Sequence, residues 1–132
     1  MSLVSRKAVW DDVSGIKKVA FDSFYTRHFT HPAYCNRPKF NNGEVIVIAN
    51  EEQIIGFAVL RIKKQQPETE IDIFGIDIDW RSKGVGSHLL GYICHNQRNP
   101  ILVLNVHKTN KNAIISVLTE IYAAQKDRIS AY

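Results

Sequence analysis

Two hydrophobic periodicities alternate along this chain, and together they predict a domain that mixes helices and strands. Runs in which apolar residues are continuous or occupy every second position are typical of strands, and they fall at 6–10, 45–49, 54–62, 70–78 and 101–106. Apolar residues three and four apart mark one face of a helix, and this spacing occurs at 13–24, 84–97 and 111–126. The predicted order is strand, helix, variable loop, three strands, helix, strand and helix.

Turn and cap signals separate these predicted elements. The polar tetrapeptide Asn50-Glu51-Glu52-Gln53 lies between two apolar runs, which is typical of a β-hairpin. Asp11-Asp12 supplies N-cap chemistry for the first helix. Between Thr26 and Asn42 the periodicity disappears, which indicates a loop with one helical turn between Thr30 and Phe40.

Length and composition narrow the class of protein. With 132 residues, of which 45% are hydrophobic, the chain can bury one sizeable core, so we expect a single domain over residues 1–132. No apolar run approaches the roughly 20 residues of a membrane span, and residues 1–7 lack an apolar signal region, so we expect a cytoplasmic protein without a membrane partner. Cys35 and Cys94 are too few for a disulfide scaffold or a four-ligand zinc site. The net charge of +4 favours anionic partners, and a coenzyme satisfies it as well as nucleic acid would.

The stretch from Arg81 to Ser87 has the features of a loop that binds an anion at a helix start. The first backbone N–H groups of a helix have no partner within it, the helix dipole adds positive charge there, and Gly84 and Gly86 leave room for a phosphate. A P-loop would need Gly-Lys-Ser/Thr after its spacer, and a dinucleotide fingerprint would need a third glycine where Leu89 stands. We therefore expect a pyrophosphate to contact Arg81, Ser82, Lys83, Gly84, Val85, Gly86 and Ser87.

The remaining pattern, Arg/Gln-x-x-Gly-x-Gly/Ala, resembles the acetyl-CoA pyrophosphate loop of the GCN5-related N-acetyltransferases (the GNAT superfamily). The hairpin residues 54–58 are similar to the family's second and third strands, 76–81 to its cofactor-binding fourth strand, and Asn110-Lys111-Asn112-Ala113 to its Asn-x-x-Ala signature. The resemblance implies a single acyl-CoA N-acyltransferase domain of the α/β (α+β) class. Its central sheet would be mixed, largely antiparallel and flanked by helices. It also implies acetyl-CoA as cosubstrate without a metal, and a primary amine on a small molecule or protein as acceptor.

The same resemblance assigns roles near the thioester. A backbone N–H of Ile76 or Ile78 would bind the thioester carbonyl, with Asp77 and Asn110 as further cofactor contacts. Acyl transfer to an amine also needs a group that accepts the ammonium proton. Glu70 stands where histone-type members carry their glutamate base, and Asp72 is the second candidate because strand residues two apart share a face. The alternative is that both are ordinary solvent-facing carboxylates.

The loop before the predicted hairpin resembles the wall of the family's acceptor pocket. We expect His31, Tyr34, Arg37 and Phe40 to line it. His28, His31 and Cys35 could suggest a metal, but the segment is irregular and has no carboxylate at helical spacing, so we do not expect zinc.

Two departures from the family pattern keep a second function open. Val117 stands where members commonly carry a tyrosine acid, and residues 125–132 are too short for the usual two terminal strands, so we expect a shortened C-terminal end. Such a chain is either an active N-acetyltransferase or a degenerate member that serves as a CoA-binding or regulatory module. Basic charge alone supports a nucleic-acid-binding domain, the weakest alternative. The exposed edge left by a short tail predicts a homodimer through residues 101–106 and 128–132.

Overall fold

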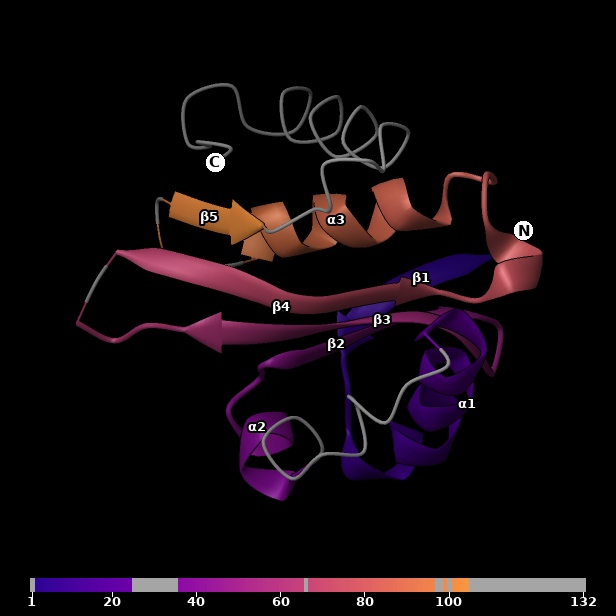
Figure 1. Ribbon diagram of the computed structural model, residues 1–132, viewed down its shortest axis with the longest axis horizontal. Helices are drawn as coiled ribbons and strands as arrows, with labels where there is room; N and C mark the ends of the chain where they lie inside the picture. Colours follow the sequence, from indigo (N-terminus) through magenta and orange to yellow (C-terminus); the bar gives the residue numbers. More distant parts are fainter. Residues whose placement is uncertain (1, 25–35, 66, 97–98, 100, 105–132) are drawn as a thin grey trace.

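A five-stranded sheet organises the protein, with helices on both of its faces (Figure 1). The computed structural model describes residues 2–24, 36–65, 67–96, 99 and 101–104. The strands are β1 (Leu3–Lys7), β2 (Val45–Asn50), β3 (Gln53–Ile62), β4 (Glu68–Ile76) and β5 (Ile101–Leu104). The helices are α1 (Val13–Phe24), α2 (Arg37–Asn41) and α3 (Val85–Asn96), with 3-10 turns η1 (Trp10–Asp12) and η2 (Ile78–Trp80).

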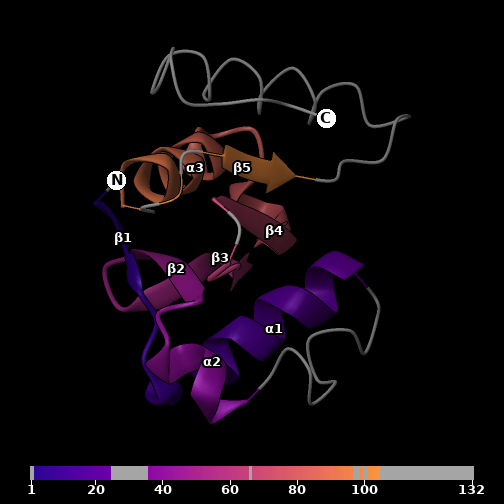
Figure 2. The same cartoon turned by 90° about the vertical axis from the view of Figure 1, so that its left-hand side faces the viewer.

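The strand order follows the chain, β1-β2-β3-β4-β5, with antiparallel pairs from β1 to β4 and a parallel β4–β5 pair. Figures 1 and 2 show α1 and α2 on one face of the sheet and α3 on the other. The mixed, largely antiparallel sheet flanked by helices predicted from the sequence is thereby confirmed.

Each face of the sheet has its own hydrophobic core. On the α3 face, Leu89 and Ile93 pack with Ile48 and Ile55. On the α1 face, Ile16 and Val19 of α1 pack with strand residues such as Phe57. Strands β2 and β3 are covered on both sides, which explains why their sequences read as continuous apolar runs rather than alternating ones.

The first strand lies earlier than the sequence predicts. We expected a strand at 6–10, but β1 is Leu3–Lys7 and its register pairs Leu3 with Asn50 and Lys7 with Ile46. The carboxylate of Asp12 accepts a hydrogen bond from the Val9 N–H at 2.8 Å and two from the Arg6 guanidinium at 2.7 and 2.9 Å. This cap turns the chain into η1 and α1 before a strand could continue.

A β-bulge in β4 changes which side chains share a face. Leu60 pairs with Ile71 and its neighbour Val59 pairs with Ile73, so Asp72 is an extra residue without a partner opposite it. As a result Ile71 packs in the α3-side core and Ile73 against the α1-side core, although they are two apart. The bulge places Asp72 beside the pair formed by Glu70 and Arg61.

Several predictions fall outside the described residues. These are the last helix at 111–126, the tail at 128–132 and the last two residues of the strand predicted at 101–106. The shortened C-terminal end and the homodimer through these segments stay predictions. Within the described part of the chain, no helix is long and apolar enough to cross a membrane.

Candidate active site

The connection from β4 to α3 is fixed by Asp77. Its amide donates to the Ile55 carbonyl of β3 at 2.8 Å, and its Oδ1 accepts the amide of Asp79 at 2.9 Å. The Trp80 amide then donates to the Asp77 carbonyl at 2.9 Å. The buried Asp77 side chain therefore caps η2 and holds the loop in place, while its predicted contact with a cofactor stays a prediction.

Two residues of the loop have a left-handed backbone conformation. Gly84 has φ of 83° and Ser82 has φ of 61°, a conformation that costs a non-glycine residue some strain. The first intrahelical bond of α3 runs from the His88 amide to the Gly84 carbonyl at 3.1 Å. The amides of the first three helical residues, Val85, Gly86 and Ser87, therefore have no carbonyl partner inside the helix.

Two exposed cations stand beside this helix start. The Nε of Arg81 donates to the Ile76 carbonyl at 3.2 Å, and the Nζ of Lys83 lies 5.4 Å from the centroid of the Trp80 ring. A Cβ at Gly86 would lie 3.6 Å from the Phe74 ring, an ordinary contact, so this position accepts alanine as the family pattern does. Three amides, a helix dipole and two cations fit a pyrophosphate.

The predicted strand end is corrected by the structure. We expected a strand over 70–78, but β4 ends at Ile76, and Ile78 belongs to the 3-10 turn. The Asp77 amide points to β3, and neighbouring amides of a strand alternate in direction, so the Ile76 amide points to the opposite edge. β5 pairs with the same edge of β4, but nearer the start of that strand, at Glu68–Ile71.

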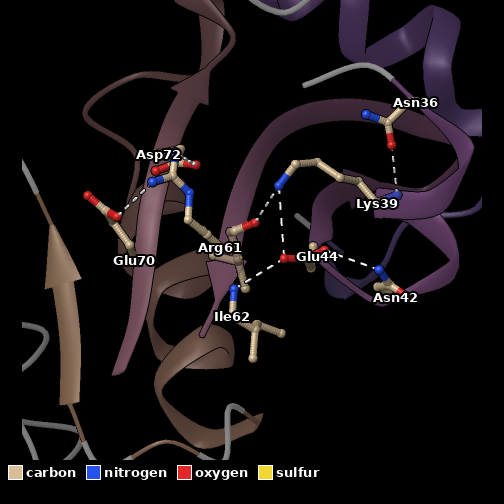
Figure 3. Close-up of polar contacts among 9 residues, drawn as sticks. Asn36, Lys39, Asn42, Glu44, Arg61, Ile62, Glu70 and Asp72 are labelled. Atoms are coloured by element: carbon tan, nitrogen blue, oxygen red, sulfur yellow. Dashed lines mark hydrogen bonds and ion pairs between the residues drawn. The ribbon is translucent and has the colours of Figure 1, made fainter. Parts of the chain in front are cut away.

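The two candidate base residues meet at one guanidinium (Figure 3). Glu70 lies directly opposite Arg61 in the β3–β4 register, and its Oε2 is 3.5 Å from Arg61 Nη1. Asp72, at the bulge, places its Oδ2 3.3 Å from Arg61 Nη2. The expectation that both carboxylates share a face of the strand agrees with this arrangement.

Asp72 is the more buried carboxylate. Its side chain is 10% exposed, compared with 19% for Glu70, and its Oδ2 accepts no hydrogen bond from the described residues. Burial raises the pKa of Asp72 above its ordinary value, and the negative charge of Glu70 adds to this, while Arg61 and Lys39 act in the opposite direction. A carboxyl whose pKa is moved toward neutrality is better suited to accept a proton at physiological pH.

Contacts from α2 hold the strand that carries Arg61 (Figure 3). The Nζ of Lys39 donates to the Leu60 carbonyl at 3.1 Å and lies 3.9 Å from Glu44 Oε2, which accepts the Ile62 amide at 3.1 Å. These bonds fix the backbone on both sides of Arg61. Asn36 caps α2 by accepting the Lys39 amide at 2.9 Å.

Of the four predicted acceptor-pocket residues, the structure describes Arg37 and Phe40. Phe40 is 5% exposed and packs edge-on against Trp10, with ring centroids 5.2 Å apart, and Arg37 lies 5.0 Å from the centroid of the same ring. These contacts place Phe40 in the α1-side core and Arg37 over its rim. His31, Tyr34 and the predicted cofactor contact Asn110 lie outside the described residues.

Sequence reasoning did not single out Arg61 or Lys39. A basic residue at the end of a strand is ordinary in a sequence, and its importance here depends on the residues opposite it. The available signal was the acidic pattern Glu70-x-Asp72 in the strand that follows the hairpin, because cross-strand pairs often carry opposite charges.

The chain is similar to known acetyltransferases. The acetyltransferase (GNAT) family matches residues 10–115. A 5-NmdU N-acetyltransferase of Pseudomonas phage PaMx11 is 32% identical over 112 residues, which cover 84% of this chain and 80% of the phage protein.

Solved structures share the fold at low sequence identity. A GNAT-family acetyltransferase from Bacillus cereus ATCC 10987 has a TM-score of 0.75 at 16% identity, covering 91% of this chain and 82% of its own. Diaminobutyrate acetyltransferase EctA from Paenibacillus lautus, in complex with its substrate L-2,4-diaminobutyric acid and coenzyme A, has a TM-score of 0.74 at 15% identity, covering 92% and 76%. PaiA N-acetyltransferase from Thermoplasma acidophilum, in complex with coenzyme A, has a TM-score of 0.72 at 17% identity, covering 90% and 88%. The helix start after β4, the sheet around it and these similarities lead to one conclusion: the chain belongs to the acetyltransferase (GNAT) family.

Proposed function

We propose that this protein is an acetyl-CoA-dependent N-acetyltransferase that acts on a primary amine. The observation that carries the proposal is the combination of two sites on one strand. A helix start with the geometry suited to an anion follows the C-terminal end of β4, and a buried carboxylate stands at the bulge of the same strand. The first site suits a pyrophosphate, and the second suits the removal of a proton from an ammonium group.

The cofactor would lie along β4. Its pyrophosphate would accept hydrogen bonds from the amides of Val85, Gly86 and Ser87, with Arg81 and Lys83 providing positive charge. Its pantetheine arm would run from the loop along β4 to the backbone N–H of Ile76 or Ile78. The four residue steps from Ile76 back to Asp72 span about 13 Å of strand, where the acceptor amine and a water would lie. The complexes of EctA and PaiA with coenzyme A support binding of the same coenzyme by this fold.

The chemistry is direct attack of the amine on the thioester. The amine nitrogen forms a bond to the acetyl carbon, the carbon–sulfur bond breaks, and the nitrogen loses its second proton, which passes through solvent to the leaving thiolate of the coenzyme. The ammonium proton passes to a carboxylate, directly or through a water. Burial and the raised pKa favour Asp72 for this step over Glu70, with Glu70 as its neighbouring charge. The developing charge on the carbonyl oxygen would be stabilised by a backbone N–H of Ile76 or Ile78.

The first acceptor to test is 5-NmdU. The phage relative is named for this substrate, and it aligns with 84% of this chain. Small diamines form the second group, since the structurally similar EctA is bound to L-2,4-diaminobutyric acid. A protein amine forms the third group. All three present a primary amine to the same carboxylate pair.

Release of free thiol from acetyl-CoA across this acceptor panel tests the proposal. Asp72→Asn should lower turnover by about 10²-fold, because a general base contributes at least that much, while Glu70→Gln should have a smaller effect. Glu52→Gln, in the exposed β2–β3 turn, is the matched control and should not change the rate. Calorimetric binding of acetyl-CoA without thiol release for any acceptor would instead identify a degenerate CoA-binding module.

The cofactor assignment has its own test at Gly86. Gly86→Ala should bind acetyl-CoA normally, because its Cβ meets only ordinary contacts. Gly86→Asp places negative charge at the helix start and should weaken binding at least about tenfold. Circular dichroism must show that both variants fold, since the aspartate also approaches the Phe74 ring. Equal affinities in two folded variants would contradict the assignment.

A further inference from the structure

Arg61 connects the two carboxylates of the candidate site. Its guanidinium lies 3.5 Å from Glu70 Oε2 through one nitrogen and 3.3 Å from Asp72 Oδ2 through another. The β3–β4 register places Glu70 opposite it, and Asp72, two residues further along β4, shares that face and is also within reach. Figure 3 shows the guanidinium extended toward both acidic side chains from the neighbouring strand.

The surroundings of Asp72 disfavour its ionised form, so a neighbouring cation is needed to keep the carboxylate charged. Among the described residues, the charged groups that act on Asp72 are Arg61 from β3, Glu70 from its own strand and Lys39 from α2. Burial and Glu70 both disfavour the ionised form of Asp72. The ammonium of Lys39 already donates to the Leu60 carbonyl and lies near Glu44. Arg61 is therefore the cation in direct contact that opposes the cost of burying the Asp72 charge.

Arg61 is also placed so that it can be altered without opening the core. Its side chain is 55% exposed, whereas that of Asp72 is 10% exposed. The backbone on either side is held by Lys39 and Glu44 through main-chain bonds at Leu60 and Ile62, which do not involve the guanidinium. A substitution of Arg61 should thus change the charge beside Asp72 while the strand keeps its position.

We propose that Arg61 is a positioning residue for acetyl transfer, which keeps the Asp72 carboxylate ionised and fixed beside Glu70 so that it can accept the ammonium proton of the acceptor. The inference rests on the proposed function, because it assigns Asp72 as the group that takes the proton. Arg61 itself touches neither the coenzyme nor the reacting atoms in this account. Its effect should appear as a change in the pH dependence of the reaction.

The first test compares pH profiles of kcat/KM for the acceptor. Arg61→Met should raise the pKa of Asp72, so the ratio of variant to wild-type kcat/KM should fall by about tenfold at acid pH and recover at alkaline pH. Using the ratio removes the titration of the acceptor amine, which is the same for both proteins. Arg61→Lys keeps a positive charge and should restore most of the profile. Lys63→Met is the matched control, because Lys63 pairs with Glu68 at 2.7 Å and does not touch Asp72.

A second measurement is independent of turnover. Carbon-13 NMR of the Asp72 carboxyl should show titration at higher pH in Arg61→Met than in wild-type protein or in Lys63→Met. An unchanged Asp72 titration would overturn the inference, and so would a kcat/KM ratio that stays constant with pH in a folded variant. Absence of acetyl transfer by the wild-type protein would refute the proposed function instead, and the NMR comparison would still decide whether Arg61 controls Asp72.

Discussion

A single added methyl group should have opposite effects at two glycines of this protein. A Cβ at Gly56 in β3 would lie 2.7 Å from Ile76 Cδ1 and 2.8 Å from Ile48 Cγ2, with the Gly75 carbonyl oxygen at 3.2 Å. Two of these contacts are shorter than real Cβ atoms show, and the third is to backbone that cannot rotate away. A Cβ at Gly91 in α3 would meet nothing within 4 Å.

The magnitudes follow from these contacts. Overpacking of a filled core costs about 1–3 kcal/mol, and the lower entropy of the unfolded alanine chain returns about 0.4–1 kcal/mol. Gly56→Ala should therefore lower the free energy of unfolding by about 1–2 kcal/mol. Gly91→Ala should raise it by up to about 1 kcal/mol, because alanine is the better helix former.

Urea denaturation followed by circular dichroism measures both changes against wild type. Gly56→Ala should move the midpoint to lower urea, and Gly91→Ala should move it to higher urea, with similar slopes. Since Gly56 pairs with Ile76 at the start of the cofactor loop, Gly56→Ala should also weaken acetyl-CoA binding, whereas Gly91→Ala should not. A Gly56→Ala protein as stable as wild type would refute the close packing of β3 against Ile76 and Ile48.

Three further substitutions test local features of the structure. The hydrogen bonds from Arg6 lower the pKa of Asp12, so the Asp12 carboxylate stabilises the fold above the ordinary aspartate value of 3.8, and this contribution is lost as pH falls through the folded-state pKa. Asp12→Asn should therefore lower the free energy of unfolding by about 1 kcal/mol near neutral pH and by little in acid, as measured by urea denaturation at several pH values. Burial raises the pKa of Asp72, so the contribution of this carboxyl to wild-type stability declines as pH rises from 3.8 through the folded-state pKa. Over that window Asp72→Asn should gain stability relative to wild type. A stability difference between the two proteins that stays constant with pH would show that the carboxyl is not desolvated. Ser82 has φ of 61°, so Ser82→Gly should raise the thermal midpoint by relieving about 1 kcal/mol of strain, and an unchanged midpoint would argue against the left-handed turn.

The sequence by itself determined the elements whose signals are local. The hairpin and the helix after the glycine loop both depend on residues close together in the chain. A turn tetrapeptide, a three-and-four spacing or a glycine pattern acts within a few residues, so periodicity was enough to place them. The same locality explains why the family resemblance could be identified from the residues of the loop.

Only the tertiary structure decided the features that depend on a distant partner. The start of β1 is set by its pairing with β2, more than 40 residues later. The bulge at Asp72 exists because β4 must match β3 on both sides of it, and an alternating sequence predicts an unbroken strand instead. Arg61 becomes part of the candidate site through that register alone. Charge, burial and contact with a second strand are properties of the packed sheet, because each depends on which residues from elsewhere in the chain occupy the space around a side chain.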